Sequence, residues 1–405
     1  MPPVVDIPKP LPYHDAIRDL VKKIDANVWD WFGKQQHSPA AQEALKFELL
    51  KSTYRLSPQS HPTYYAAAAE CAEKLGIKAP LTIYQAQADT LLNASIMLGD
   101  NEIHIVLFGD IDNTFDDAEL RALFGHELGH YVLQTLDDGE HLRAWDILRA
   151  TTLEERVHPA FMQSFRKLSL YTEIYCDQVA LRVVDDLDAV VSTLVKLVTG
   201  IKKVVPAEFL KQAHEILSRP KSDVVSEGVT HPEAYLRAAA AQAFHKQAPK
   251  FQSTLTRWIE GPWDTANLDL LQQRDLSQAT RVLIREALQH RVLQSDLMLS
   301  HARLYFEDFT REECVEIVGE NLLQKLSAEK LSTEALVNYF CYVLLDFATA
   351  DRDLDEVPLA SVLCVAEKWK IKDALLPLVR KEMKLRKNQV ELCDKTKTDI
   401  LSAAK

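Results

Sequence analysis

The sequence has few glycines and no long apolar run, and each shortage excludes a class of protein. Only 11 of the 405 residues are glycine, while good helix formers such as alanine, leucine, glutamate and lysine are abundant, which favours a mostly helical fold. The longest apolar stretch, 335–350, contains Asn338 and Asp346, and 190–205 is interrupted by lysines. Neither reaches the roughly 18–20 uninterrupted apolar residues of a membrane-spanning helix, so no transmembrane span is expected.

Paired cysteines and basic clusters are also missing. The six cysteines are isolated along the chain, which indicates reduced thiols rather than a disulfide framework. The first residues show no basic region followed by an apolar run, so a secretory signal is not expected. The formal net charge of −12 argues against binding to nucleic acid or to anionic membranes. We therefore predict a cytoplasmic protein that binds no nucleic acid.

The most informative feature that is present is an H-E-x-x-H pattern at residues 126–130. On a helix, positions i and i+4 share a face, so His126 and His130 can bind one tetrahedral Zn²⁺. Glu127 follows the first of these histidines, where it can take a proton from a zinc-bound water and pass it to a leaving amine. The pattern therefore predicts the site of a zinc-dependent peptidase.

The alternative interpretation is a polar helix that carries two unrelated histidines. Against it, apolar residues recur at helical spacing and indicate a largely buried helix: Leu120, Leu123, Phe124, Leu128, Tyr131 and Val132. Buried histidines and a buried glutamate are costly unless they are satisfied, and a metal satisfies them together. Thr114 and Asp117 predict the capped start of this helix, with Asp116 complementing its dipole. Gly125 and Gly129 would let another element approach closely.

A catalytic zinc ion needs a third protein ligand and one open position. The pattern with a third histidine is excluded because Leu136 stands at its place. Glu154 and Glu155 lack an aspartate four residues later, whereas Glu173 is followed at that spacing by Asp177. The alternative for this pair, a solvated acidic helix surface, conflicts with the apolar neighbours in the sequence. Glu173 is therefore predicted as the third ligand.

The order of these motifs resembles the HtpX and CaaX prenyl protease family of gluzincin zinc peptidases, metallopeptidase family forty-eight. In that family a His-Pro follows the two helices, with an arginine six residues after the histidine, as in His231-Pro232 and Arg237 here. The stretch 92–95 also resembles the asparagine-alanine segment before the family's active-site hairpin. The resemblance covers about residues 64–237.

The resemblance implies the role of each residue in the metal site. His126, His130 and Glu173 would bind one Zn²⁺ per chain, and Glu127 would be the general base. Asp177 would accept the remaining N–H of a ligand histidine and so set its tautomer. Peptides or proteins would be the substrates.

Two further residues have open assignments. By the resemblance, His231 or Arg237 would stabilise the oxyanion of the tetrahedral intermediate. His231 is alternatively a loop-to-helix cap before Pro232, which is a favoured first helical residue. Arg237 is alternatively a salt-bridge partner of Glu173 or Asp177.

A hairpin is expected just before the zinc-binding helix. Residues 91–98 and 102–108 are strand-like and are separated by a turn signal. In peptidases of this kind, an exposed edge strand pairs with the extended substrate backbone, which assigns Asn93 and Ala94 to the substrate strand. The alternative, an ordinary small sheet packed on the zinc helix, is compatible with this assignment.

The expected fold class is mainly α (α+β), with a small sheet beside the active-site helix and an all-helical C-terminal domain. Trp29, Trp31, Phe32 and Phe47 are expected in the core. The predicted divisions are an N-terminal helical segment (1–60), a zinc-peptidase domain (61–255), a linker (256–270), a helical domain (271–390) and a polar tail (391–405).

The helical domain contains one further resemblance, over residues 340–370, to the TerB-like family of stress-associated helical domains. Aspartates alternate over 351–355 as in a calcium loop, but Glu356 and Val362 stand where that loop needs glycine and glutamate. An acidic turn that caps the next helix is therefore favoured over a second metal site.

Two hypotheses of function follow. The first is a soluble zinc metalloendopeptidase in which Glu127 serves as base to a zinc-activated water. The second is a latent or inactive zinc-peptidase scaffold, whose C-terminal helical domain binds a protein partner in a stress response.

Overall fold

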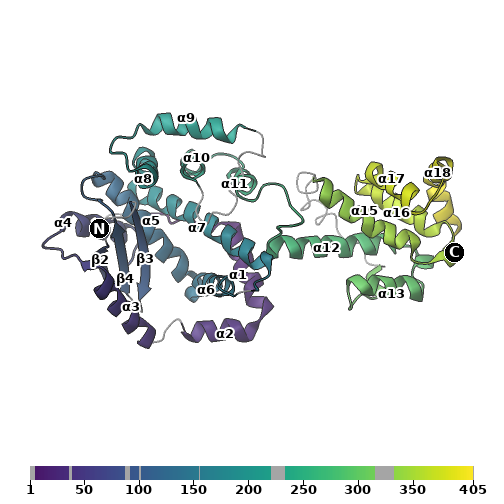
Figure 1. Ribbon diagram of the computed structural model, residues 1–405, viewed down its shortest axis with the longest axis horizontal. Helices are drawn as coiled ribbons and strands as arrows, with labels where there is room; N and C mark the ends of the chain where they lie inside the picture. Colours follow the sequence, from purple (N-terminus) through teal and green to yellow (C-terminus); the bar gives the residue numbers. More distant parts are fainter. Residues whose placement is uncertain are drawn as a thin grey trace. The chain divides into compact units, whose positions relative to one another are not determined.

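A computed structural model describes residues 5–35, 39–86, 92–99, 102–154, 156–219, 233–314 and 333–404. The chain divides into two compact units, Met1–Gly261 and Pro262–Lys405, each of which is described by itself (Figure 1). The predicted mainly helical fold with a small sheet is confirmed. None of the helices in the described part of the chain combines the length and hydropathy that a membrane crossing requires.

The described residues of the first unit form one four-stranded sheet and eleven α-helices. The strands are β1 (Tyr54–Arg55), β2 (Leu81–Gln85), β3 (Asn93–Gly99) and β4 (Glu102–Phe108). The first helices are α1 (Pro12–Ile24), α2 (Ala26–Gln35), α3 (Pro39–Ser52), α4 (Pro62–Lys74), α5 (Asp117–Thr135) and α6 (Glu140–Thr151). The remaining helices are α7 (Pro159–Val184), α8 (Leu187–Thr199), α9 (Pro206–Leu217), α10 (Ala234–His245) and α11 (Phe251–Glu260).

The sheet leaves β3 at its edge. The strand order is β1-β2-β4-β3, with β2 parallel to β4 and β3 antiparallel to β4. The β3–β4 register runs from Asn93 opposite Phe108 to Gly99 opposite Glu102, which matches the expected hairpin. Residues 91, 100 and 101 of that expected hairpin lie outside the described residues. One side of β3 is therefore unpaired within the described sheet.

The two faces of the sheet pack differently because side chains alternate along a strand. Leu49 of α3 forms a small core with Tyr84 and Val106 on one face. Ile103 and Ile105 belong to the opposite face and are fully buried. Figure 1 shows α3 on one side of the strands and α5 on the other. The sheet therefore lies beside α5, with Ile103 and Ile105 buried.

The start of α5 differs from the expectation in one detail. The N-cap is Asp116, whose carboxylate accepts hydrogen bonds from the Ala118 and Glu119 N–H groups, while the Glu119 carboxylate accepts the Asp116 N–H. The predicted Thr114–Asp117 pattern is wrong because the Thr114 hydroxyl donates to the Asp110 carbonyl instead. The capping box satisfies N–H groups that have no partner inside the helix.

Helix α5 packs tightly against α7, and two glycines allow it. A Cβ atom at Gly125 would lie 3.1 Å from the Cα of Ala180, and one at Gly129 would lie 3.0 Å from the Cα of Cys176. The expectation that these glycines permit close approach of another element is confirmed. The two helices that carry the predicted metal ligands are therefore held at short distance by backbone contact.

Helix α8 is attached to the start of α5 by a buried ion pair. The Lys196 ammonium donates to the Glu119 carboxylate at 2.5 Å and to the Thr114 carbonyl at 2.8 Å. The side chains of Lys196 and Glu119 are only 6% and 7% exposed. The Thr193 hydroxyl adds a hydrogen bond to the Glu119 carbonyl. Glu119 thus joins the cap of α5 to the buried face of α8.

Replacing Lys196 with methionine is expected to lower the free energy of unfolding by about 3–5 kcal/mol, because it leaves a buried carboxylate without its cation. Urea denaturation measures the loss. The double variant Lys196→Met/Glu119→Gln should recover part of it, because glutamine is neutral and still accepts the Asp116 N–H. Lys211→Met, at an exposed lysine of α9, is the matched control. A loss in Lys196→Met no larger than in this control would contradict the prediction.

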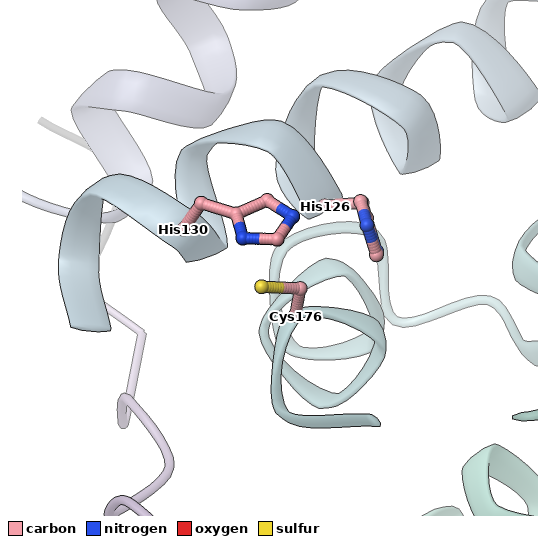
Figure 2. Close-up of side chains that lie close together, drawn as sticks. All are labelled: His126, His130 and Cys176. Atoms are coloured by element: carbon pink, nitrogen blue, oxygen red, sulfur yellow. The ribbon is translucent and has the colours of Figure 1, made fainter. Parts of the chain in front are cut away.

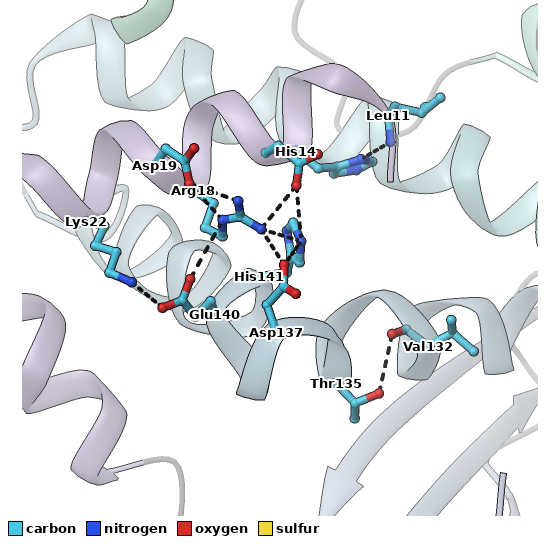
Figure 3. Close-up of polar contacts among 11 residues, drawn as sticks. Leu11, His14, Arg18, Asp19, Lys22, Val132, Thr135, Asp137, Glu140 and His141 are labelled. Carbon is cyan, nitrogen blue, oxygen red and sulfur yellow. Dashed lines mark hydrogen bonds and ion pairs between the residues drawn. The ribbon is translucent and has the colours of Figure 1, made fainter. Parts of the chain in front are cut away.

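The N-terminal helix α1 is held against α7 by buried contacts of His14 and against residues 137–141 by more exposed ion pairs (Figure 3). His14 accepts the Leu11 N–H at Nδ1, and its Nε2 lies 3.3 Å from the Thr172 hydroxyl. Burial, with His141 nearby, lowers the pKa of His14 to about 3, so this imidazole is neutral. Arg18 donates to Asp137 at 2.6 Å, and Lys22 pairs with Glu140. Helix α1 is therefore part of the same packed unit as the zinc-motif helix.

Two of the four aromatic residues expected in the core are exposed. Trp29 is buried beneath Arg143, whereas Trp31 is 56% exposed and Phe47 is 64% exposed. Trp31 lies two residues beyond Trp29, which places it on the opposite side of α2, and Phe47 is related in the same way to Leu49 of α3. The expectation fails because the hydrophobic pattern does not say which face of a helix is covered.

The second unit is entirely helical within its described residues. Its helices are α12 (Leu270–Ala287), α13 (Asp296–Tyr305), α15 (Glu334–Thr349), α16 (Val357–Lys368), α17 (Lys372–Glu382) and α18 (Lys387–Ala403). They share one core that includes Leu283, Phe340, Phe347 and Leu363. The predicted polar tail 391–405 is wrong, because α18 runs through most of it and buries Cys393 in this core.

The acidic loop before α16 is tied into the second unit through Asp351. Its carboxylate accepts hydrogen bonds from the Ser295 hydroxyl at 2.8 Å and from the Asp353 N–H at 3.1 Å. Asp351 is 8% exposed, so these hydrogen bonds satisfy a buried charge. The TerB-like resemblance of this region stays a prediction.

Candidate metal and catalytic site

The H-E-x-x-H residues lie within the long buried helix α5. The rings of His126 and His130 have centroids 5.2 Å apart and stand nearly perpendicular to each other. Glu127 is 4% exposed and lines the same cleft as both histidines. Figure 2 shows the two imidazoles side by side on one face of α5. The helix therefore presents two metal-binding nitrogens and an adjacent carboxylate to one space.

Helix α7 places Glu173 opposite the two histidines. Its carboxylate oxygens lie 3.5 Å from His126 Nε2 and 3.7 Å from His130 Nε2. With zinc–ligand bonds of about 2.0–2.2 Å at tetrahedral angles, ligand atoms are separated by about 3.3–3.6 Å. The observed separations are close to this range. The donor set of two imidazoles and one carboxylate, which α5 and α7 hold together, therefore fits a zinc ion.

Asp177 orients the first of these histidines. His126 Nδ1–H donates to an Asp177 carboxylate oxygen at 2.9 Å, because a carboxylate oxygen can only accept. The Nε2 atom of a neutral His126 then carries the lone pair on the side of Glu173 and His130. This is the arrangement that a metal ligand requires.

Arg237 of α10 joins the two carboxylates of α7. Its guanidinium donates to Asp177 at 2.7 Å and 2.8 Å, and it lies 2.9 Å from Glu173. Burial by itself raises the pKa of Asp177, but the charge of Arg237 outweighs burial and lowers that pKa. Arg237 was assigned either to oxyanion stabilisation or to a salt bridge with Glu173 or Asp177, and these contacts are those of the salt bridge. His231 lies outside the described residues, as do Thr230 and Pro232.

The metal-free site binds a proton where it would bind zinc. Burial by itself lowers the pKa of His126, but hydrogen bonds to Asp177 and Glu173 outweigh burial and raise the pKa to about 9. Zinc needs the neutral imidazole, so the metal and the proton compete. Zinc affinity is therefore expected to rise by about tenfold per pH unit from about pH 6.5 to about pH 9, and then to level off.

A competition titration with a chromophoric chelator at several pH values measures this dependence. In Asp177→Asn, loss of the carboxylate lowers the pKa of His126, so the plateau is reached at lower pH. The plateau affinity itself should be about 10–100-fold weaker, as when other residues that hydrogen-bond a metal ligand are replaced. A wild-type affinity that does not change with pH over this range would contradict the prediction.

Cys176 is a residue near the site whose position sequence reasoning missed. Its sulfur and the ring nitrogens of His126 and His130 lie within 4.8 Å of one another (Figure 2). Its backbone also packs on Gly129. Burial, followed by the charges of Glu173 and Asp177, raises the pKa of this thiol well above its usual value. A neutral thiol is a poor zinc ligand, so the geometry and charge favour Glu173.

A second group of potential metal ligands lies between α1 and the segment after α5. It consists of Asp15, Asp137 and His141. The Arg18 guanidinium lies among them, 3.1 Å from Asp15, 2.6 Å from Asp137 and 3.2 Å from His141 (Figure 3). Arginine already supplies the positive charge here, so this group is a structural ion-pair cluster.

The metal-binding residues open into a cleft of about 510 Å³. Asn93 and Ala94 of the edge strand β3, which the sequence assigns to the substrate strand, line this cleft. Residues of α6 and α8 line it as well, and among these are Trp145, Leu194 and Val198. No motif marks these residues in the sequence, because they come from helices without a recognisable pattern.

Comparisons with known proteins agree with this geometry. The model of the family described as "Peptidase family M48" matches residues 58–136, which include the H-E-x-x-H pattern. The chain is 26% identical to the plastoglobule-localized metallopeptidase 48 of Arabidopsis thaliana, a chloroplastic protein, over 245 residues. That alignment covers 56% of this chain and 69% of the relative. No solved structure matches the chain. The family-model match and this relative together support the M48 metallopeptidase family for the chain.

Proposed function

We propose that this protein is a zinc-dependent endopeptidase that uses His126, His130 and Glu173 as metal ligands and Glu127 as general base. The observation that carries the proposal is the placement of the Glu173 carboxylate 3.5 Å and 3.7 Å from the two Nε2 atoms, in a cleft that all three residues line. Zinc bound there would supply a Lewis acid that acidifies a water molecule and polarises the scissile carbonyl.

The side chains of the cleft would carry out the remaining steps. A carboxylate oxygen of Glu127 would accept the proton of the attacking water and deliver it to the leaving nitrogen. Asp177 and Arg237 would hold His126 and Glu173 in their orientations. The developing oxyanion would be stabilised by His231 or Arg237, of which Arg237 already donates to two carboxylates. These contacts support a positioning role for Arg237.

The substrate would bind as an added strand. The free side of β3, with Asn93 and Ala94, lies along the cleft and offers backbone groups to an extended peptide. Backbone pairing selects for extended conformation and not for sequence, so unfolded proteins and flexible peptides are suitable substrates. Cleavage of casein or of quenched fluorescent peptides, together with the zinc content of the same preparation, tests the proposal.

We also propose a cytoplasmic location. The free cysteines of the described residues support it, because a reducing compartment preserves them. The name of the Arabidopsis relative places that protein in the chloroplast, which makes a plastid the main alternative. Fractionation of cells that express the full chain with a small tag decides between the two, and recovery from an organelle would overturn the proposal.

A further inference from the structure

One side of the cleft carries apolar side chains that the catalytic proposal does not use. They are Leu194, Leu197 and Val198 of α8, here called the apolar wall. Val198 is 65% exposed, which leaves its side chain accessible to a bound ligand, while Leu194 is 4% exposed and anchors the wall in the core. An exposed valine beside a buried leucine gives the cleft an apolar surface that is open to solvent.

The described residues that line the cleft carry ionisable groups only at the proposed metal-binding and catalytic positions. Among the described residues that line it, the ionisable ones are His126, Glu127, His130, Glu173 and Arg237. A charged substrate side chain against the apolar wall would lose water without gaining a partner, and burial of an unpaired charge is costly. An apolar side chain there would instead gain free energy by leaving water. The apolar wall is therefore expected to favour apolar substrate side chains over charged ones.

The apolar wall is held rigidly in place. Lys196, on the buried side of the same helix α8, is bonded to Glu119 and Thr114 at the start of α5. Glu119 and His126 belong to the same helix, α5. The distance between the wall and the metal ligands is thus fixed by buried contacts, and a preformed surface of this kind binds its ligand with little ordering cost.

Strand β3 and the apolar wall line the same cleft. A peptide paired with β3 would be extended, and its side chains would alternate between the two faces of the added strand. The cleft of about 510 Å³ contains both the wall and the metal ligands, so a side chain on the wall belongs to a residue close to the scissile bond. On the basis of the peptidase function above, we propose that the apolar wall is the specificity pocket and selects peptides with a large apolar residue beside the scissile bond.

Three quenched peptides that differ at one position test this proposal with the zinc-loaded full chain. Their shared sequence is small and neutral, and the variable residue is leucine, glutamate or lysine. The leucine peptide should have a kcat/KM about 10–100-fold higher than the other two, with the cut next to the leucine, as for pockets that discriminate apolar groups. Equal kcat/KM values for the three peptides would overturn the proposal.

A charge change in the wall should alter this preference. Val198→Lys should lower kcat/KM for the leucine peptide by about tenfold and raise it for the glutamate peptide several-fold, because the new ammonium pairs with the carboxylate. Val198 is exposed, so the variant should fold. Leu153→Lys is the matched control, because Leu153 is 79% exposed and does not line the cleft. The same change in preference in both variants would overturn the proposal.

A binding measurement separates this proposal from the proposed function. Fluorescence polarisation with the Glu127→Gln variant reports the affinity for each peptide without turnover. If no peptide is cleaved by the wild type, the proposed function fails. A Kd at least tenfold lower for the leucine peptide, lost on adding Val198→Lys, would still support the apolar wall. Equal Kd values would overturn it.

Discussion

Replacing Glu127 with glutamine is expected to lower the rate of peptide hydrolysis by about 10²–10⁴-fold, the usual contribution of a general acid–base residue. Glutamine has nearly the same shape but cannot accept the proton of the attacking water. The side chain is 4% exposed beside the metal-binding histidines, so its carboxylate has little contact with bulk solvent. The zinc content should stay near one per chain, because Glu127 is not among the three proposed ligands.

Casein or quenched-peptide cleavage and elemental analysis of the same samples measure both quantities. Glu73→Gln, at an exposed glutamate of α4, is a matched control and should retain full activity. Wild-type activity in Glu127→Gln would remove Glu127 from the mechanism, and loss of zinc would make it a ligand. The latent-scaffold alternative makes a separate prediction, namely that the biological effect of the protein survives this substitution.

Replacing Glu173 with alanine is expected to reduce bound zinc sharply and to abolish hydrolysis. A catalytic zinc site uses three protein ligands, and two histidines alone hold the metal weakly. The Glu173 carboxylate lies 3.5 Å and 3.7 Å from the two Nε2 atoms. Among the described residues that line the cleft, the only other carboxylate is that of Glu127. Arg237 keeps Asp177 as its partner, which should preserve the fold.

Two matched substitutions make this experiment specific. Glu154→Ala removes an exposed glutamate that the motif spacing rejects as a ligand, and it should leave zinc unchanged. Cys176→Ser removes the sulfur that lies near both histidines. Zinc lost from Cys176→Ser but kept by Glu173→Ala would assign the third ligand to the thiol. Treatment of the wild type with a chelator should stop hydrolysis, and added zinc should restore it.

Local sequence patterns were enough to predict the helices that carry the site. His126 and His130, and likewise Glu173 and Asp177, are spaced i, i+4, and this spacing places each pair on one face of a helix wherever the helix lies. The hairpin was also predictable, because turn signals and alternation are local. The capping residue of α5 was misplaced because several neighbouring residues can each cap a helix, and only the backbone selects Asp116.

The errors at the ends of the chain have a different cause. The sequence from 391 onward is polar, but α18 places Cys393 in the core of the second unit. Trp31 and Phe47 are apolar, but each lies on the uncovered side of its helix. Both errors concern burial, which depends on what packs against a helix and not on the composition of the helix itself.

The sequence by itself predicted the residues of the candidate metal site, because ligand type and helical spacing are properties of short segments. Only the tertiary structure decided that Arg237 joins Glu173 to Asp177, that Cys176 lies beside the histidines, and that α8 supplies the apolar wall. These relations connect residues that are far apart in the chain. They arise from the backbone contact of α5 with α7 at Gly125 and Gly129 and from the buried pair of Lys196 and Glu119, which no local pattern encodes.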